Sequence, residues 1–152
     1  MASRVGPEAS VRFRCSGSAA EVVGPGETIE VGALTGAAPW RTFRWREGQK
    51  HYSGNFWSAT ENDFVIYESR LELTRLLFAD FDQSVQHIVA QPFMLQVDVD
   101  GVLRQHIPDY LLFTDEERVV VDVKPHHRVE RPGNDFTFAW TRRARAIARL
   151  AL

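Results

Sequence analysis

Cysteine is nearly absent from this sequence, in which Cys15 is the only one. A single cysteine excludes a disulfide within the chain and a cysteine-rich zinc site. Long apolar runs are also missing, and none approaches the roughly 18 residues that a membrane-spanning helix needs. The first residues lack the apolar stretch of a signal peptide, so we expect a cytoplasmic protein with no membrane partner.

A strong excess of charge of either sign is missing too, because 18 Lys and Arg residues stand against 20 Asp and Glu residues. The resulting net charge of -2 does not indicate a nucleic-acid-binding protein by itself. Any DNA-binding surface must therefore come from local clustering of basic side chains. The length of 152 residues and the hydrophobic content of 44% are sufficient for one domain with one sizeable core.

Composition and periodicity divide the chain into two parts. Residues 1–38 are rich in Gly, Ala, Ser and Pro, and we interpret them as an N-terminal arm that is partly irregular. Residues 39–152 are expected to form the main domain. Their patterns predict aromatic strands over about 40–67, a helix from Ser69 to about Asp82, strands over about 86–98, 104–113 and 118–124, and a helix over about 135–150.

This order of elements predicts an α/β fold, with a central mixed β-sheet flanked by helices and preceded by the β-rich N-terminal segment. Asp100 and Gly101 have the composition of a tight hairpin turn. The continuous apolar run Val119–Val121 is typical of a strand buried on both faces. We therefore expect the strand over 118–124 to lie at the centre of the sheet.

Two carboxylates interrupt these apolar strands, Asp109 in one and Asp122 in the next. Because burying an unpaired carboxylate is costly, each needs a partner or a metal ion. On neighbouring strands the two aspartates could share one Mg²⁺, which prefers oxygen ligands. Asp122 and Lys124 are two residues apart, so on a strand they share a face, and the carbonyl of Val123 could add a backbone ligand.

The same residues also have purely structural interpretations. Asp109 could simply end a strand, and Asp122 could form an ion pair with Lys124. Glu72 on the first helix could supply a third carboxylate to a metal ion. Ser69 and Glu72 also fit a capping box, in which both side chains accept from N–H groups at the start of a helix. The two roles compete for one carboxylate, and these residues alone leave both open.

Several short segments resemble a known family of nucleases. Pro108-Asp109 followed by Asp122-x-Lys124 resembles the PD-(D/E)xK nuclease superfamily. The resemblance is closer to the TnsA-like endonuclease subunits of transposases, over residues of roughly 40–140. Five segments in order carry it: YESRLEL at 67–73, ADFD at 79–82, AQPF at 90–93, HIPD at 106–109 and VDVKP at 121–125.

This resemblance implies a restriction-endonuclease-like core that hydrolyses DNA with Mg²⁺, or with Mn²⁺ in its place. Carried over by position, it implies Glu72, Asp109 and Asp122 as metal ligands, with the Val123 carbonyl beside them, and Lys124 as the catalytic lysine. Related chains usually continue after the last helix into a further strand, whereas this sequence ends at Leu152. We therefore expect the sheet either to lack an edge strand or to have that place filled by the N-terminal arm or by a second copy.

Two further residues are secondary candidates at the same site. Glu68 lies one helical turn before Glu72 and could reach the same face of the helix. Gln91 belongs to the AQPF segment and is a possible further contact. The implied partners are double-stranded DNA and a transposase subunit that cuts the other strand, with a homodimer possible and association with the nucleoid when DNA is bound. The alternative function is a catalytically silent nuclease fold that binds DNA or a transposase.

A basic stripe is expected near the C-terminus, where Arg142, Arg145 and Arg149 are spaced three and then four residues apart. On a helix this spacing puts the three guanidinium groups on one side, where they could bind phosphates. The alternative is an ordinary solvated helix face. His126 and His127 are expected in a loop near the site.

Overall fold

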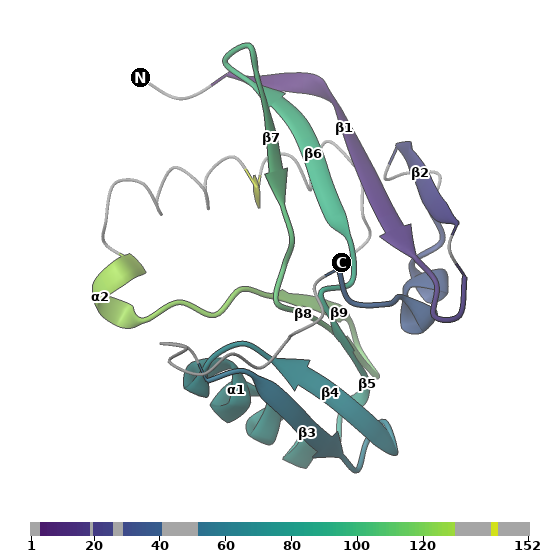
Figure 1. The fold of residues 1–152 in the computed structure, drawn as a ribbon, viewed down its shortest axis with the longest axis vertical. Helices are drawn as coiled ribbons and strands as arrows, with labels where there is room; N and C mark the ends of the chain where they lie inside the picture. The colour runs from purple at the N-terminus through teal and green to yellow at the C-terminus, as the bar shows by residue number, and fades with distance from the viewer. Residues whose placement is uncertain (1–3, 19, 26–28, 41–51, 130–140, 143–152) are drawn as a thin grey trace.

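The computed structural model describes residues 4–18, 20–25, 29–40, 52–129 and 141–142 (Figure 1). Its elements in chain order are β1 (Val5–Arg14), β2 (Glu21–Pro25), the 3-10 helix η2 (Val31–Gly36), β3 (Gly54–Ser58), β4 (Asp63–Tyr67), α1 (Arg70–Phe81), β5 (Val85–Ala90), β6 (Met94–Val99), β7 (Val102–His106), β8 (Tyr110–Thr114), β9 (Arg118–Val121) and α2 (His126–Val129).

The described chain is a mixed α/β structure in which strands dominate. The strands form a four-stranded sheet in the order β2-β1-β6-β7, a hairpin of β3 and β4, and a three-stranded sheet in the order β5-β8-β9. Every pairing among the described strands is antiparallel. The expected mixture of parallel and antiparallel pairs is therefore not found in them, because most neighbours are joined by short hairpins that reverse the chain.

The centre of the three-stranded sheet is β8, and the expectation that the strand over 118–124 would be central is wrong. Residues 110–113 of β8 are all buried, whereas β9 lies at the edge of the described sheet and begins with the exposed Arg118. Leu111 and Phe113 pack into one hydrophobic cluster, and Tyr110 and Leu112 pack into the other. A strand between two cores has apolar side chains on both faces, which explains its unbroken apolar sequence.

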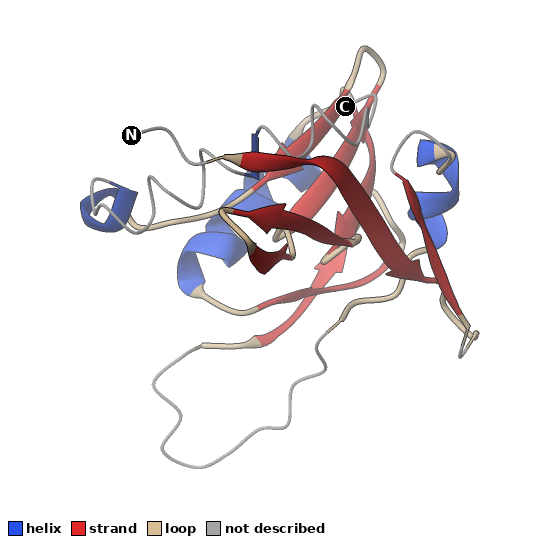
Figure 2. Cartoon of the chain, turned by 90° about the horizontal axis from the view of Figure 1, so that it is seen from above, coloured by secondary structure: helices blue, strands red, loops and turns tan. Residues whose placement is uncertain are grey.

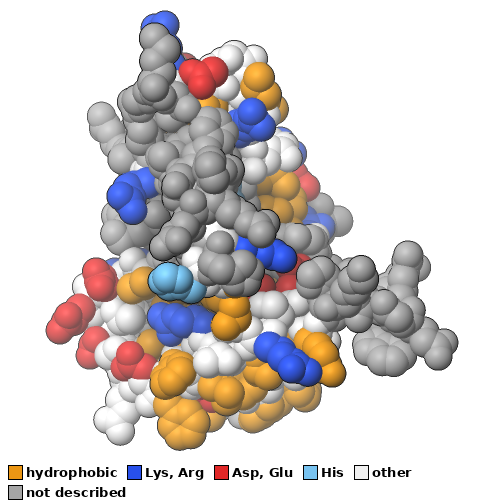
Figure 3. All heavy atoms as spheres, turned by 90° about the vertical axis from the view of Figure 1, so that its left-hand side faces the viewer, with side chains coloured by type: hydrophobic (Ala, Val, Ile, Leu, Met, Phe, Trp, Pro, Cys, Tyr) orange, Lys and Arg blue, Asp and Glu red, His pale blue; other side chains and the backbone are white. Residues whose placement is uncertain are grey.

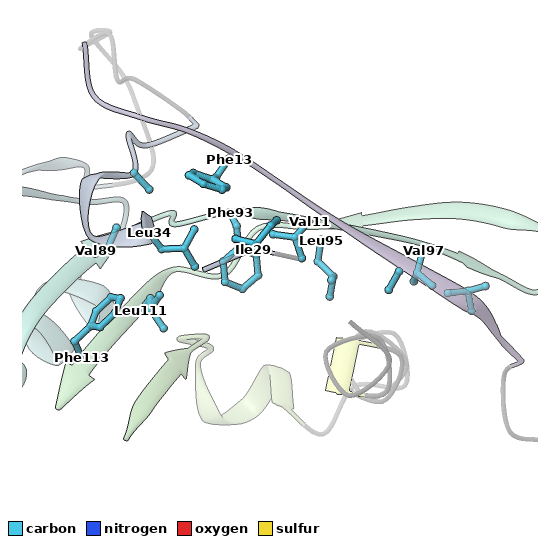
Figure 4. Packing of buried hydrophobic residues seen from close by; sticks show 13 residues of the cluster. Val11, Phe13, Ile29, Leu34, Val89, Phe93, Leu95, Val97, Leu111 and Phe113 are labelled. Carbon is cyan, nitrogen blue, oxygen red and sulfur yellow. The ribbon is translucent and has the colours of Figure 1, made fainter. Parts of the chain in front are cut away.

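The N-terminal segment contributes to the first of these cores. β1 pairs with β6 on one side and with β2 on the other. Figure 4 shows side chains from β1 and η2, such as Val11, Phe13 and Leu34, packed with residues of β5, β6 and β8. The segment expected as an arm thus packs with the rest of the described chain. Its strand joins β6, and so does not extend the sheet beyond β9.

Two strands that the sequence predicts as unbroken each divide at a bend. The stretch over 86–98 separates into β5 and β6 at Gln91, which has a φ of 46°. Its partner over 104–113 separates into β7 and β8 at Ile107–Asp109, where Pro108 lacks the N–H that a ladder requires. The stretch from β5 to β6 therefore passes from the three-stranded sheet into the four-stranded sheet, and the stretch from β7 to β8 passes back (Figure 1). The predicted hairpin turn is confirmed, since Asp100 and Gly101 have φ values of 55° and 80°.

Helix α1 forms where the sequence predicts it. Ser69 caps its start, and Asp82 caps its end. Its last turn is fastened to the β3–β4 hairpin through the Asp80 carboxylate, which accepts from Ser58 Oγ at 2.6 Å, from the Thr60 N–H at 2.9 Å and from the Ala59 N–H at 3.1 Å. Burial opposes ionisation of Asp80, but these hydrogen bonds outweigh it and hold its pKa below the ordinary value.

The region after β9 differs from the expectation in two respects. The strand predicted to continue to Lys124 ends at Val121, and the short helix α2 begins at His126 where a loop was expected. Figure 2 shows that α2 and η2 lie on opposite sides of the strand layers. The helix predicted over 135–150 lies outside the described residues, except for Thr141 and Arg142, which are helical.

We predict that Asp80→Ala lowers the free energy of unfolding by about 2–4 kcal/mol. Three hydrogen bonds to a charged acceptor are lost, and the buried Ser58 hydroxyl loses its acceptor. Urea unfolding at pH 7 measures the change, with Glu116→Ala on the exposed surface as the matched control. Because the pKa of Asp80 is depressed, the difference from wild type should shrink as the pH falls through that value. A loss no larger than that of the control contradicts this account.

Candidate metal centre

Three polar residues occupy the same end of the three-stranded sheet. Ala90 pairs with Tyr110, and Tyr110 pairs with Val121, so these residues form one row across β5, β8 and β9. The next position on each chain segment is Gln91, Asp109 and Asp122, respectively. The register therefore brings together two of the predicted ligands and one of the secondary candidates, which are far apart in the sequence.

The Asp109 carboxylate extends the ladder at this end of the sheet. Backbone pairing continues one step beyond the strands, because the Gln91 N–H donates to the Asp109 carbonyl at 2.9 Å and the Asp109 N–H donates to the Val121 carbonyl at 3.0 Å. The Val123 N–H then donates to Asp109 Oδ2 at 2.6 Å. A side-chain oxygen takes the place of a strand carbonyl, and β9 ends here.

The start of α1 brings Glu72 to the same region, in a variant of the predicted capping box in which its carboxylate accepts from the N–H of Glu68 and not from that of Ser69. The Glu72 N–H donates to Ser69 Oγ at 3.1 Å, and the Glu68 N–H donates to Glu72 Oε2 at 2.8 Å. Ser69 Oγ also lies 3.3 Å from Glu72 Oε1. Both carboxylate oxygens of this buried glutamate therefore have partners at the helix start.

Tyr110 connects this helix start to the central strand. Its hydroxyl lies 2.9 Å from the carbonyl of Ile66 and 3.4 Å from Glu72 Oε2. Burial, followed by the nearby charges of Glu72 and Asp109, raises the pKa of the Tyr110 hydroxyl, which stays protonated and can donate. No sequence pattern predicted a role for Tyr110, although it is the only hydroxyl-bearing residue among the buried positions of β8.

The secondary candidates lie beside these groups. The Gln91 side-chain amide donates from Nε2 to Glu68 Oε1 at 3.1 Å. Glu68 precedes the helix cap, and its charge raises the pKa of both Glu72 and Asp109. Glu68 is therefore close to both predicted ligands without taking part in the cap through its side chain.

Asp122 has a partner that the sequence did not identify. His106 Nε2 lies 2.9 Å from Asp122 Oδ1, and both side chains are largely buried. The alternative of an ion pair between Asp122 and Lys124 assumed that both residues lie on one face of a strand. The strand β9 ends at Val121, before either residue. Lys124 is exposed, and its positive charge opposes the rise that burial causes in the pKa of Asp109. A histidine three residues before Asp109, in the HIPD segment, was the available signal.

Burial and mutual repulsion govern the electrostatics of the cluster. Burial raises the pKa of Glu72, and the charges of Asp109 and Glu68 raise it further. Burial likewise raises the pKa of Asp109, assisted by Asp122 and Glu68, and opposed by the Val123 hydrogen bond and by Lys124. Among the described residues, Lys124 is the one cation that acts on the pKa of Asp109, so a bound cation would supply further positive charge to these largely buried carboxylates.

The residues fit Mg²⁺ by their chemistry, because carboxylate and carbonyl oxygens are its preferred ligands. Their side chains, however, do not yet surround a common point. In the part of the chain that the structure describes, no three His, Cys, Asp or Glu side chains are grouped as a metal site. Glu72 faces the helix cap, and Asp109 uses one oxygen for Val123. Metal binding would require these carboxylates to turn toward a common point.

The predicted basic stripe lies mostly outside the described residues. Arg142 is described and exposed, whereas Arg145 and Arg149 are not described. Figure 3 shows a face on which the described basic and acidic side chains are mixed, with hydrophobic side chains gathered along its lower end. The described part of this face therefore presents no extended surface of one charge.

Comparisons with protein-family models, with curated proteins and with solved structures find no match for this chain. Among the described residues, no helix has both the length and the apolar character to cross a membrane.

We predict that Asp109→Asn increases stability most at alkaline pH. The pKa of Asp109 is raised by folding, so its protonated form is favoured in the folded state, and its ionisation destabilises the fold as the pH rises through that value. Asparagine keeps an oxygen that can accept from the Val123 N–H but carries no charge.

Thermal unfolding of wild type and Asp109→Asn at pH 4 and pH 8 measures this effect. The Tm of the variant relative to wild type should be higher at pH 8 than at pH 4. A relative Tm that is equal or lower at pH 8 would show that repulsion and burial do not control this carboxylate.

Proposed function

We propose that this chain is a metal-dependent DNA endonuclease, and that it acts as a TnsA-like strand-cutting subunit of a transposase. The main support is the position of Asp109 and Asp122 on adjacent segments at one end of the sheet, next to the start of α1. The raised pKa values of Asp109 and Glu72 support it further, because such a cluster gains from a divalent cation. The nuclease-like segments at 106–109 and 121–125 contain these same residues.

Asp109 and Asp122 would hold the ion, with the Val123 carbonyl and one glutamate as further ligands. When bound, Mg²⁺ would acidify a coordinated water molecule and neutralise the scissile phosphate. Lys124 is exposed and lies two residues after Asp122, so its ammonium group could bind the phosphate and orient the attacking water. The Val123 N–H holds Asp109 Oδ2 beside the end of β9, which limits how far this carboxylate would have to turn to reach the ion.

Glu72 and Glu68 compete for the place of the third carboxylate. The family pattern favours Glu72, which is buried and engaged in the capping box. Glu68 is held by the Gln91 amide, and its charge acts on Asp109. In this proposal Glu72 is the ligand, and Gln91 restrains Glu68 beside it.

The resemblance to TnsA-like subunits is what suggests DNA and a transposase as partners. Among the described arginines, Arg142 is exposed and available for a phosphate contact. A homodimer is compatible with the same proposal, since a subunit that cuts one strand at each transposon end acts at two ends.

A second candidate function is a non-cutting module that binds DNA or a transposase. The observation in its favour is that the carboxylates of the described residues are not grouped as a metal site, and that Glu72 already has a structural role. The raised pKa values count against it, because a module without a metal ion would keep these buried charges at a cost in stability.

We predict that the wild-type chain nicks supercoiled plasmid DNA with Mg²⁺ or Mn²⁺ and not with EDTA. Asp122→Ala and Lys124→Ala should lower the rate at least about 100-fold, because the first removes a ligand of the ion and the second removes the positive charge proposed to bind the phosphate. Asp115→Ala, on the exposed surface, is the matched control and should keep the wild-type rate. A wild-type protein that binds DNA in a gel-shift assay but never cuts it would establish the non-cutting module instead.

Replacing each glutamate by glutamine separates the capping role from the metal role. Glutamine also serves in a capping box, so Glu72→Gln should keep the wild-type Tm within a few degrees and should lose at least about 100-fold in nicking rate. Glu68→Gln should lose less than about tenfold. The reverse order of the two losses would assign the metal ligand to Glu68.

A further inference from the structure

Asp122 lies at the point where β9 has left the ladder. The last register pair of this strand is Val121 with Tyr110, so the backbone of Asp122 has no partner from strand pairing. Its carboxylate is nevertheless largely buried, with 15% of the side chain exposed. The only hydrogen bond of this carboxylate among the described residues comes from His106, at Oδ1.

His106 is well placed to restrain this carboxylate. It ends β7, where it pairs with Leu95 of β6, so its backbone is fixed by the four-stranded sheet. Asp122 follows the edge strand of the other sheet. The contact therefore joins the two sheets at the bend, three residues before Asp109, which itself holds the Val123 N–H.

The direction of the hydrogen bond follows from the chemistry of the pair. A carboxylate has only acceptors, so the tautomer of His106 that fits this contact carries a proton on Nε2 and donates it to Oδ1. Oδ2 of Asp122 makes no hydrogen bond to any described residue, so one oxygen is fixed and the other remains for a ligand. Groups that fix one oxygen of a ligand in this way typically change metal affinity or activity 10- to 100-fold.

A second pair of this kind offers an internal comparison. His87 and Glu61 lie 3.4 Å apart, at a site that includes none of the predicted ligands, and their side chains are 51% and 21% exposed. For His106 and Asp122 the separation is 2.9 Å and the corresponding values are 14% and 15%. The shorter, more buried contact is the one at the candidate metal centre.

We propose that His106 is a positioning residue, which orients Asp122 so that Oδ2 faces the divalent cation. This inference rests on the proposed function, since it assigns a role toward the same cation. His106 itself touches neither the ion nor the DNA. Without it, Asp122 would sample several orientations at the end of β9, and the ion would bind more weakly because that freedom is lost on binding.

The test compares three substitutions by direct Mn²⁺ binding, followed through the electron paramagnetic resonance signal of free Mn²⁺. Glutamine places its amide nitrogen near the position of Nε2, whereas the amide of asparagine stops short of it. We expect His106→Gln to bind Mn²⁺ within about threefold of wild type, and His106→Asn and His106→Leu to bind 10- to 100-fold more weakly. His87→Leu is the control and should bind like wild type.

Plasmid nicking at increasing Mg²⁺ gives a second measurement. In His106→Asn the Mg²⁺ concentration for half-maximal nicking should rise 10- to 100-fold, while the rate at saturating Mg²⁺ stays within about threefold of wild type. Circular dichroism and Tm measurements establish that each variant is folded. If His106→Leu does not fold, the comparison of His106→Asn with His106→Gln decides the matter.

The outcomes separate this inference from the proposed function. If wild type binds Mn²⁺ and cuts DNA, and folded His106→Asn binds Mn²⁺ equally well, then His106 is only a tether between the sheets and this inference is overturned. Equal weakening in His106→Gln and His106→Asn overturns it too, because a donor at the Nε2 position would then have no effect. A wild-type protein that neither binds Mn²⁺ nor cuts DNA overturns both.

Discussion

The bend in the long hairpin of residues 85–114 is the constraint on which this structure depends. Both of its strands leave one sheet and enter another at Gln91 and at Ile107–Asp109, so the ladder is interrupted on both at the same level. Backbone groups at an interruption need partners, because unpaired buried polar groups are costly. The Asp109 carboxylate supplies one by accepting from Val123, and it thereby becomes fixed beside the next carboxylate. The Asp109 carboxylate therefore both satisfies the Val123 N–H and belongs to the candidate functional site.

Stability and the candidate chemistry oppose each other at this site. Burial and neighbouring negative charges raise the pKa values of Glu72 and Asp109, so their ionised forms destabilise the fold. Two hydrophobic cores on either side of β8 hold the sheet that carries them. The hydrogen bonds of Asp80 fasten α1, whose first turn contains Glu72, to the β3–β4 hairpin. The strongly packed parts of the molecule thus lie directly around the charged cluster.

The Glu72 carboxylate has two kinds of partner available to it, the neutral donors of the helix cap and a divalent cation. Without a cation, its oxygens are held by the Glu68 N–H and the Ser69 hydroxyl. A divalent ion would compete with these neutral donors for the carboxylate, and its double charge would favour the exchange. The contact of Asp122 with His106 differs, since it uses one oxygen and leaves the second open. The two proposed ligands would therefore contribute unequally to a metal site, with Asp122 oriented in advance and Glu72 reoriented on binding.

Local sequence determined the elements whose signals are contained within a few residues. Ser69 and Glu72 specified the helix start, and Asp100-Gly101 specified a turn, because capping and positive φ depend on neighbouring residues only. The pairing of β1 with β6, the central place of β8 and the bend at Gln91 were decided by long-range packing, which no short pattern encodes. The aspartates could be selected from the sequence as costly charges in apolar strands. The contact of His106 with Asp122 could not, because it joins two sheets whose relation exists only once the chain has folded.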